Sequence, residues 1–170
     1  MYNFEYYTPT FIEFGKKSEE KVAQLIKAQN GKKVLIHYGG GSVIRSGLMQ
    51  TVTDALDAEG IAHVSLGGVK PNPRASLVYE GIELRRREGV DFVLPVGGGS
   101  AIDTAKAIAL GIPYKGDFWD LWTGKAVPAA RIPVGTVLTL AATGSESSNS
   151  AVITREDTRE KVGLNHQLNR

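Results

Sequence analysis

The chain has 170 residues, enough for one domain with a sizeable core, and its hydrophobic and charged fractions of 42% and 22% are those of an ordinary globular protein. A net charge of +2 is too small to indicate a nucleic acid or an anionic membrane as a partner, and the lack of cysteine excludes disulfides and thiolate chemistry. No apolar run could span a bilayer and the N-terminus lacks the features of a signal peptide, so we expect a cytoplasmic protein without membrane contacts.

The N-terminal stretch alternates β-forming and polar residues, which predicts a strand over residues 6–14. Pro9 cannot donate a backbone hydrogen bond, so this strand is expected at the edge of a sheet. A helix is predicted over residues 18–29, because its apolar residues share one face and Gly31 follows it.

Strands and helices alternate regularly through the middle of the chain. Strands are predicted at residues 34–36, 61–66 and 90–96, and helices at residues 44–56, 76–87 and 101–110. The strands start at nearly equal intervals, which is typical of βαβ units with right-handed crossovers. The sequence therefore predicts an α/β fold: a Rossmann-like open, mainly parallel sheet with helices on both faces.

This alternation ends after Gly111. Residues 114–124 predict a short amphipathic turn of helix, whose tryptophans are expected to pack in the core or at an interface. An apolar strand is predicted over residues 134–140, and residues 151–154 and 161–164 are predicted to form a C-terminal β-hairpin.

Small-residue turns follow the predicted strands at residues 39–42, 68–73 and 97–100. The carboxyl ends of parallel strands lie along one edge of the sheet, where ligands bind. The turn at 97–100 also opens a helix, so its unpaired N–H groups and the helix dipole favour an anion such as a pyrophosphate. The alternative is a tight connection only, and Ile102 stands where the dinucleotide fingerprint needs its third glycine.

Two charged residues have both a structural and a functional interpretation. Asp103 either faces a ligand or complements the helix dipole, and Lys161 either neutralises a phosphate or ribose neighbour or is an exposed strand lysine. The three histidines have no metal-ligand spacing, so we assign no metal ligand and no catalytic residue.

The first glycine turn bears on the cofactor. NAD sites often place an acid near the end of a strand to accept hydrogen bonds from the ribose hydroxyls. Here the strand ends in Tyr38 and is followed by Gly39, Gly40, Gly41 and Ser42, with no acid. A 2′-phosphate would meet no like charge there, which favours NADP over NAD.

Five stretches together resemble the iron-containing (group III) alcohol dehydrogenases, especially the NADP(H)-dependent butanol dehydrogenase branch. They are Tyr7–Gly15 in part, Tyr38–Ser42, Pro71–Pro73, Val96–Lys106 and Val137–Glu146, and they cover nearly the whole chain in order. The resemblance implies that residues 1–170 form a dinucleotide-binding domain.

The resemblance also implies roles for individual residues. Gly39, Gly40, Gly41 and Ser42 would face the adenosine ribose and its phosphate, with Asn72 near the same half of the cofactor. The pyrophosphate and nicotinamide would be approached by Gly98, Gly99, Ser100 and Asp103. Thr139, Leu140 and Thr143 would line the adenine and nicotinamide pocket, and Lys161 would bind the ribose.

Members of this family continue into a helical domain whose aspartate and three histidines bind Fe or Zn, and this sequence ends before such ligands. We therefore expect an NADP(H)-binding domain of a metal-dependent alcohol dehydrogenase or aldehyde reductase, acting on substrates such as butanol or butanal and inactive by itself. The sequence is also compatible with a homodimer. The alternatives are a stand-alone, non-enzymatic nucleotide-binding module and a domain of a related polyol or glycerol-phosphate dehydrogenase.

Overall fold

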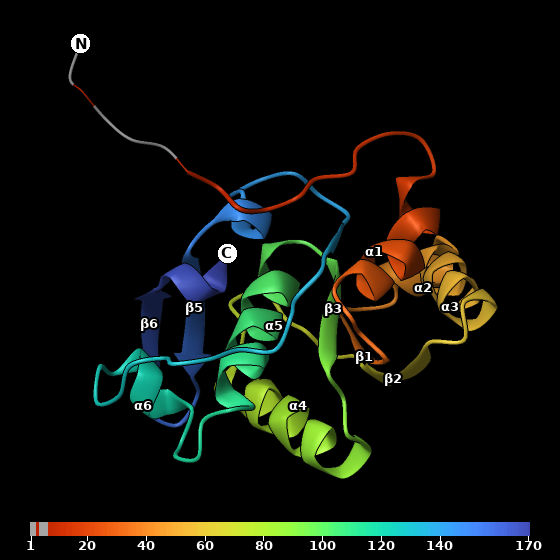
Figure 1. Cartoon of the computed structure of the whole chain (residues 1–170). Helices are drawn as coiled ribbons and strands as arrows, with labels where there is room; N and C mark the ends of the chain where they lie inside the picture. The colour runs from red at the N-terminus through yellow and green to blue at the C-terminus, as the bar shows by residue number, and fades with distance from the viewer. Residues whose placement is uncertain (1–2, 4–6) are drawn as a thin grey trace.

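A computed structural model describes residue 3 and residues 7–170. Its strands are β1 (Lys33–Tyr38), β2 (Ala62–Leu66), β3 (Phe92–Gly97), β4 (Val137–Leu138), β5 (Ser150–Arg155) and β6 (Glu160–Asn165) (Figure 1). Its α-helices are α1 (Val22–Ala28), α2 (Ser42–Arg45), α3 (Leu48–Ala58), α4 (Ala75–Glu88), α5 (Gly99–Gly111) and α6 (Trp119–Trp122). Short 3₁₀ turns are η1 (Ser18–Lys21), η2 (Ser145–Ser147) and η3 (Gln167–Asn169).

The first four strands form one parallel sheet in the order β2-β1-β3-β4. The two central strands, β1 and β3, are buried almost throughout, as expected for parallel strands covered on both faces. The remaining strands, β5 and β6, pair as an antiparallel hairpin. The predicted α/β class, the parallel sheet and the C-terminal hairpin are thus confirmed.

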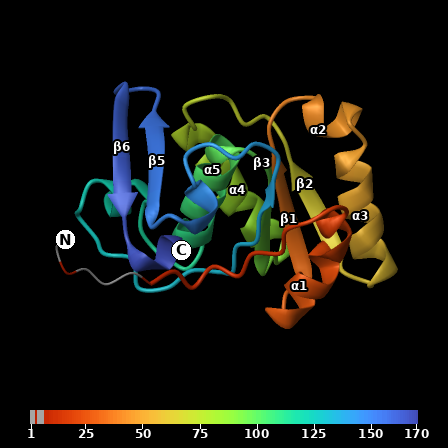
Figure 2. The same ribbon diagram turned by 90° about the horizontal axis from the view of Figure 1, so that it is seen from above.

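Helices cover both faces of the sheet. Because successive side chains of a strand point to opposite faces, Leu35 packs with α4 and α5, whereas Val34 and Ile36 pack with α1 and α3. Figure 2, seen from above, shows these two groups of helices on either side of β1 and β3. No helix in the described part of the chain is long and apolar enough to cross a membrane.

The predicted N-terminal strand is wrong over residues 7–14, and Tyr6 lies outside the described residues. This segment pairs with no strand and passes over η2, where the Thr10 hydroxyl donates to the Glu146 carbonyl oxygen at 3.5 Å (Figure 1). Its apolar side chains remain exposed, with Phe14 at 96% and Phe11 at 73%, so the alternating pattern buries no face.

Two other boundaries differ from the prediction. The helix expected over residues 44–56 is divided into α2 and α3, because Gly47 between them adopts a left-handed conformation with φ of 80°. The strand expected over residues 134–140 pairs with β3 only at β4 and through an isolated bridge at Val134. In contrast, α6 forms as predicted, and both of its tryptophans are buried in the core.

His37 is the one histidine fully buried among the described residues, on β1 between β2 and β3. Its Nδ1 lies 3.0 Å from the carbonyl oxygen of Leu66, and its Nε2 has no hydrogen-bond partner. Burial lowers the pKa of this imidazole to about 4, although the hydrogen bond to Leu66 opposes the shift. The folded protein therefore holds His37 neutral, as a structural residue in the middle of the sheet.

We predict that the free energy of unfolding falls as the pH falls from about 6.5 to about 4, by up to ~3 kcal/mol from His37 alone. The unfolded chain takes up a proton in this range that the folded chain does not. Urea denaturation at several pH values should show a shallower loss in His37→Gln. His63→Gln, on the neighbouring strand β2, is the control, and its free energy of unfolding should fall with pH as steeply as that of the unmodified protein. An equally steep fall in His37→Gln would show that His37 does not cause this pH dependence.

Candidate functional site

Four turns meet at the carboxyl edge of the parallel sheet. Tyr38 at the end of β1 pairs with Val96 near the end of β3, so the turns at 39–42 and 98–100 leave the sheet side by side. On the other side of β3, the Thr139 N–H donates to the Gly97 carbonyl oxygen at 3.1 Å. The turn after β2 joins the first turn, because the Gly68 N–H donates to the Gly39 carbonyl oxygen at 3.3 Å.

The glycines leave the middle of this edge open. A Cβ atom added to Gly40 or Gly98 would meet nothing within 4 Å, so a ligand can approach the backbone at both positions. No side chain caps the first turn of α5. The N–H groups of Ala101 and Ile102 donate to the Gly98 carbonyl oxygen at 3.0 and 3.2 Å, so the amides of Gly99 and Ser100 are the donors of this turn that a ligand could use. A Cβ on Gly99 would lie 3.3 Å from the Thr143 hydroxyl, which places the loop after β4 against the start of α5.

Asp103 links α5 to the chain that follows this loop. One carboxylate oxygen accepts from the Ser145 hydroxyl at 2.5 Å, and the other accepts from the Val152 N–H at 3.1 Å. This contact is a third role beside the two considered from the sequence, since it joins the first turns of α5 to η2 and to β5. It also fixes where the Asp103 carboxylate lies relative to the open edge.

Lys106 is a functional candidate that the sequence reasoning missed. It lies one helical turn after Asp103, is 4% exposed, and its Nζ donates to the carbonyl oxygens of Ser145, Ser148 and Ser150 at 2.6, 2.9 and 3.1 Å. A lysine inside the otherwise apolar run 105–110 was the available signal, because a buried ammonium needs several acceptors. These hydrogen bonds fix the loop that carries Thr143 beside Gly99.

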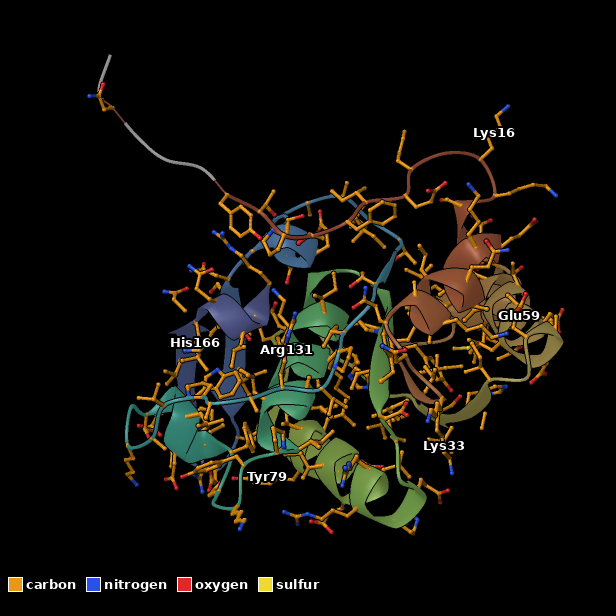
Figure 3. All side chains as sticks on the ribbon, viewed as in Figure 1. Lys16, Lys33, Glu59, Tyr79, Arg131 and His166 are labelled. Atoms are coloured by element: carbon orange, nitrogen blue, oxygen red, sulfur yellow. The ribbon has the colours of Figure 1, made fainter. Side chains whose placement is uncertain are left out.

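Burial lowers the pKa of the Lys106 ammonium to about 8, while the nearby carboxylate of Asp103 raises it. Arg131, which precedes β4, lowers the pKa of Lys106 further, and Glu146 raises it. The Arg131 guanidinium is itself half-buried, and Figure 3 shows it beside α5. At neutral pH Lys106 therefore remains charged and can donate to all three carbonyl groups.

Asn72 and Lys161 form a second group at the same edge. The Lys161 Nζ donates to the Asn72 side-chain oxygen at 2.8 Å, and Asn72 itself adopts a left-handed conformation with φ of 58°. The hairpin is attached to this turn, because the Thr154 N–H donates to the Pro73 carbonyl oxygen at 2.7 Å. Its Glu156 carboxylate accepts from the Ser76 hydroxyl and N–H, which caps α4.

The predicted site residues thus fall into two groups. The glycine turns, Ser42, Ser100, Asp103, Thr139 and Thr143 lie around the ends of β1, β3 and β4, and the pair of Asn72 and Lys161 lies beyond the turn after β2. Leu140 is 68% exposed on the loop after β4 and is free to contact a ligand. A hollow between this second group and α4, which the sequence did not predict, is lined by Lys70, Arg74, Glu80 and Thr104, among others.

The described residues contain no group of three or more histidines, aspartates or glutamates that could hold a metal ion. His166, the histidine nearest the C-terminus, accepts from the Leu168 N–H through Nδ1 at 3.2 Å and so caps η3. The described residues therefore provide no ligand set for iron or zinc.

The open parallel sheet, with helices on both faces and glycine turns at its carboxyl edge, has the architecture of the doubly wound α/β domains. A model of the family described as "Iron-containing alcohol dehydrogenase" matches residues 9–170, and the chain belongs to this family. The structure of NADH-dependent butanol dehydrogenase A from Thermotoga maritima superposes with a TM-score of 0.95 at 44% identity, over 98% of this chain and 42% of that one.

Two curated relatives show the same partial coverage. Probable NADH-dependent butanol dehydrogenase 1 of Bacillus subtilis is 48% identical over 99% of this chain and 43% of its own length. The NADPH-dependent aldehyde reductase YqhD of Escherichia coli is 43% identical over 95% of this chain and 41% of its own length. The chain thus spans about two fifths of the length of the relatives that it matches.

We predict that Lys106→Met lowers the free energy of unfolding by about 2 kcal/mol, because three carbonyl groups lose a charged donor while the cost of burying the charge is removed. Hydrogen exchange should become faster at residues 145–150 before it does so in β1 or β3. Lys115→Met, which removes an exposed lysine, is the matched control and should change neither quantity. Unaltered exchange at 145–150 in Lys106→Met would show that the ammonium does not fix this loop.

Proposed function

We propose that residues 1–170 form the NADP(H)-binding domain of an alcohol dehydrogenase or aldehyde reductase that acts on small primary alcohols or aldehydes such as butanol and butanal. The observation that carries this proposal is the open cradle between the ends of β1 and β3, where neither Gly40 nor Gly98 has a neighbour at its Cβ position. Membership of the iron-containing alcohol dehydrogenase family supports it, and so does the dinucleotide dependence in the names of the relatives.

In this proposal each group at the edge has one task. The turn of Gly39, Gly40, Gly41 and Ser42 receives the adenosine ribose and its phosphate, and Asn72 and Lys161 hold the same half of the cofactor. Gly98, Gly99 and Ser100 receive the pyrophosphate at the N-terminus of α5. Asp103 approaches the nicotinamide half, and Thr139, Leu140 and Thr143 form the wall on the β4 side. Bound NADPH would supply the hydride, and the residues of this chain bind and orient it.

The choice between NADP and NAD rests on charge. No acid follows β1 at residues 39–42, so nothing at this turn repels a 2′-phosphate. The relatives divide on this point, because the names of the B. subtilis protein and the E. coli reductase specify NADH and NADPH respectively. We therefore propose NADP(H) as the preferred cofactor and NAD(H) as the weaker one.

A cytoplasmic location and a homodimer are further proposals, to be tested by cell fractionation and gel filtration.

We predict that NADPH binds to the 170-residue chain more tightly than NADH, as measured by calorimetric titration. Gly39→Asp should reverse this preference, because its carboxylate repels a 2′-phosphate and accepts hydrogen bonds from free ribose hydroxyls. The new Cβ would lie 3.5 Å from the Val69 carbonyl oxygen, an ordinary contact, so the fold should persist. Equal affinity for ATP, ADP and NADPH would instead favour a non-enzymatic nucleotide-binding module.

Gly98→Ala tests the cradle itself. Its Cβ enters open space and the backbone is extended, with φ of −95°, so we expect the free energy of unfolding to change by less than about 0.5 kcal/mol. The same methyl group should raise the Kd for NADPH about tenfold, because it holds the pyrophosphate away from the backbone. Ala28→Val on α1 adds apolar volume far from the edge and should leave the Kd unchanged. Full affinity in Gly98→Ala would place the cofactor elsewhere.

Since the described residues contain no group of three or more side chains that could hold a metal ion, we predict that the 170-residue chain reduces no aldehyde, even with added Fe²⁺ or Zn²⁺. An NADPH oxidation assay with butanal measures this directly. Turnover by the purified chain would show that the reaction can proceed without the metal site that the family name implies.

A further inference from the structure

The turn after β1 carries an arginine that none of the roles above uses. Arg45 is the last residue of α2, the single helical turn that begins at Ser42. Its N–H donates to the Gly41 carbonyl oxygen at 2.8 Å, so its backbone is anchored to the glycine turn. Its side chain folds back over that turn, because a Cβ atom added to Gly41 would overlap Nη1 of Arg45. The guanidinium thus lies directly against the residues proposed to receive the adenosine ribose.

No carboxylate of the described residues lies within ion-pair distance of this guanidinium. By contrast, the exposed neighbours Arg86 and Arg87 on α4 pair with Glu83 and Glu88. Arg45 is itself exposed, and the Ser42 hydroxyl beside it is also exposed. The turn therefore presents an uncompensated cation and a hydroxyl next to the open space at Gly40.

This combination fits a phosphate monoester. A guanidinium presents paired N–H donors that match two phosphate oxygens, and the hydroxyl of a serine can bind a third. In dinucleotide-binding folds the 2′-phosphate of NADP lies near the end of a neighbouring strand, where an arginine accommodates it. The absence of an acid at residues 39–42 only removes a charge that would repel the 2′-phosphate, whereas the Arg45 guanidinium attracts it.

We propose that Arg45 is the residue that selects NADP(H) over NAD(H), by binding the 2′-phosphate of the adenosine ribose. This inference rests on the proposed function, since it needs the ribose to lie at the turn after β1. Dinucleotide binding alone would not require that one side chain determine this preference.

The test compares the Kd values for NADPH and NADH in the 170-residue chain and in Arg45→Gln. The ratio of the NADH value to the NADPH value should fall about tenfold, because only NADPH loses a charge-assisted contact. The Kd for NADH should stay within about twofold of the unmodified protein. Arg45→Lys keeps the charge without the paired donors and should give an intermediate ratio. Adenosine 2′,5′-bisphosphate should lose affinity in Arg45→Gln, and adenosine 5′-monophosphate should not.

Arg86→Gln on α4 removes an exposed arginine away from this edge and is the matched control, with an unchanged ratio. A loss of equal size for NADPH and NADH in Arg45→Gln would assign Arg45 to the pyrophosphate or to the fold and overturn the inference. An unchanged ratio, or a wild-type preference for NADH, would overturn it as well, while dinucleotide binding would stand. Failure of the unmodified chain to bind either dinucleotide would refute the proposed function together with this inference.

Discussion

The parallel register of β1 against β3 is the constraint on which the rest of the site depends. Pairing of Tyr38 with Val96 brings two glycine turns, nearly sixty positions apart in the sequence, to the same level of one sheet edge. Both strands are buried on both faces, so a shift of register would move large apolar side chains out of two cores at once. The position of the open cradle is therefore determined by hydrophobic packing some distance below it.

Hydrogen bonds from two charged side chains of α5 fix the loop beside this edge. Asp103 and Lys106 lie one turn apart on α5 and bind the same segment, the first through the Ser145 hydroxyl and the second through three carbonyl oxygens. The Asp103 carboxylate also raises the pKa of Lys106 and so favours its charged form. The loop after β4 is thus held against the start of α5 by buried polar contacts rather than by strand pairing, which ends at Leu138.

The repeating elements could be predicted from the sequence because their signals are local. Apolar strands at regular intervals and helices closed by glycine indicate a parallel sheet, and the turns at its carboxyl edge follow from that topology. The segment at residues 7–14 has an equally clear alternating pattern, but no neighbouring strand accepts it, and such a partner cannot be read from local periodicity. The contacts of Lys106 and the Lys161–Asn72 pair were not predictable for the same reason, since the latter joins residues 89 positions apart.

The cap of α4 has a consequence for how the chain acquires its structure. The first turn of this helix receives its acceptor from Glu156, which follows Ser76 by 80 positions. During synthesis the helix therefore emerges from the ribosome with its N-terminal amides exposed to water, and it gains this partner only after the hairpin has formed. Completion of the sheet edge is coupled in this way to a segment made later, so a chain interrupted before residue 156 would carry the glycine turns on an incomplete scaffold.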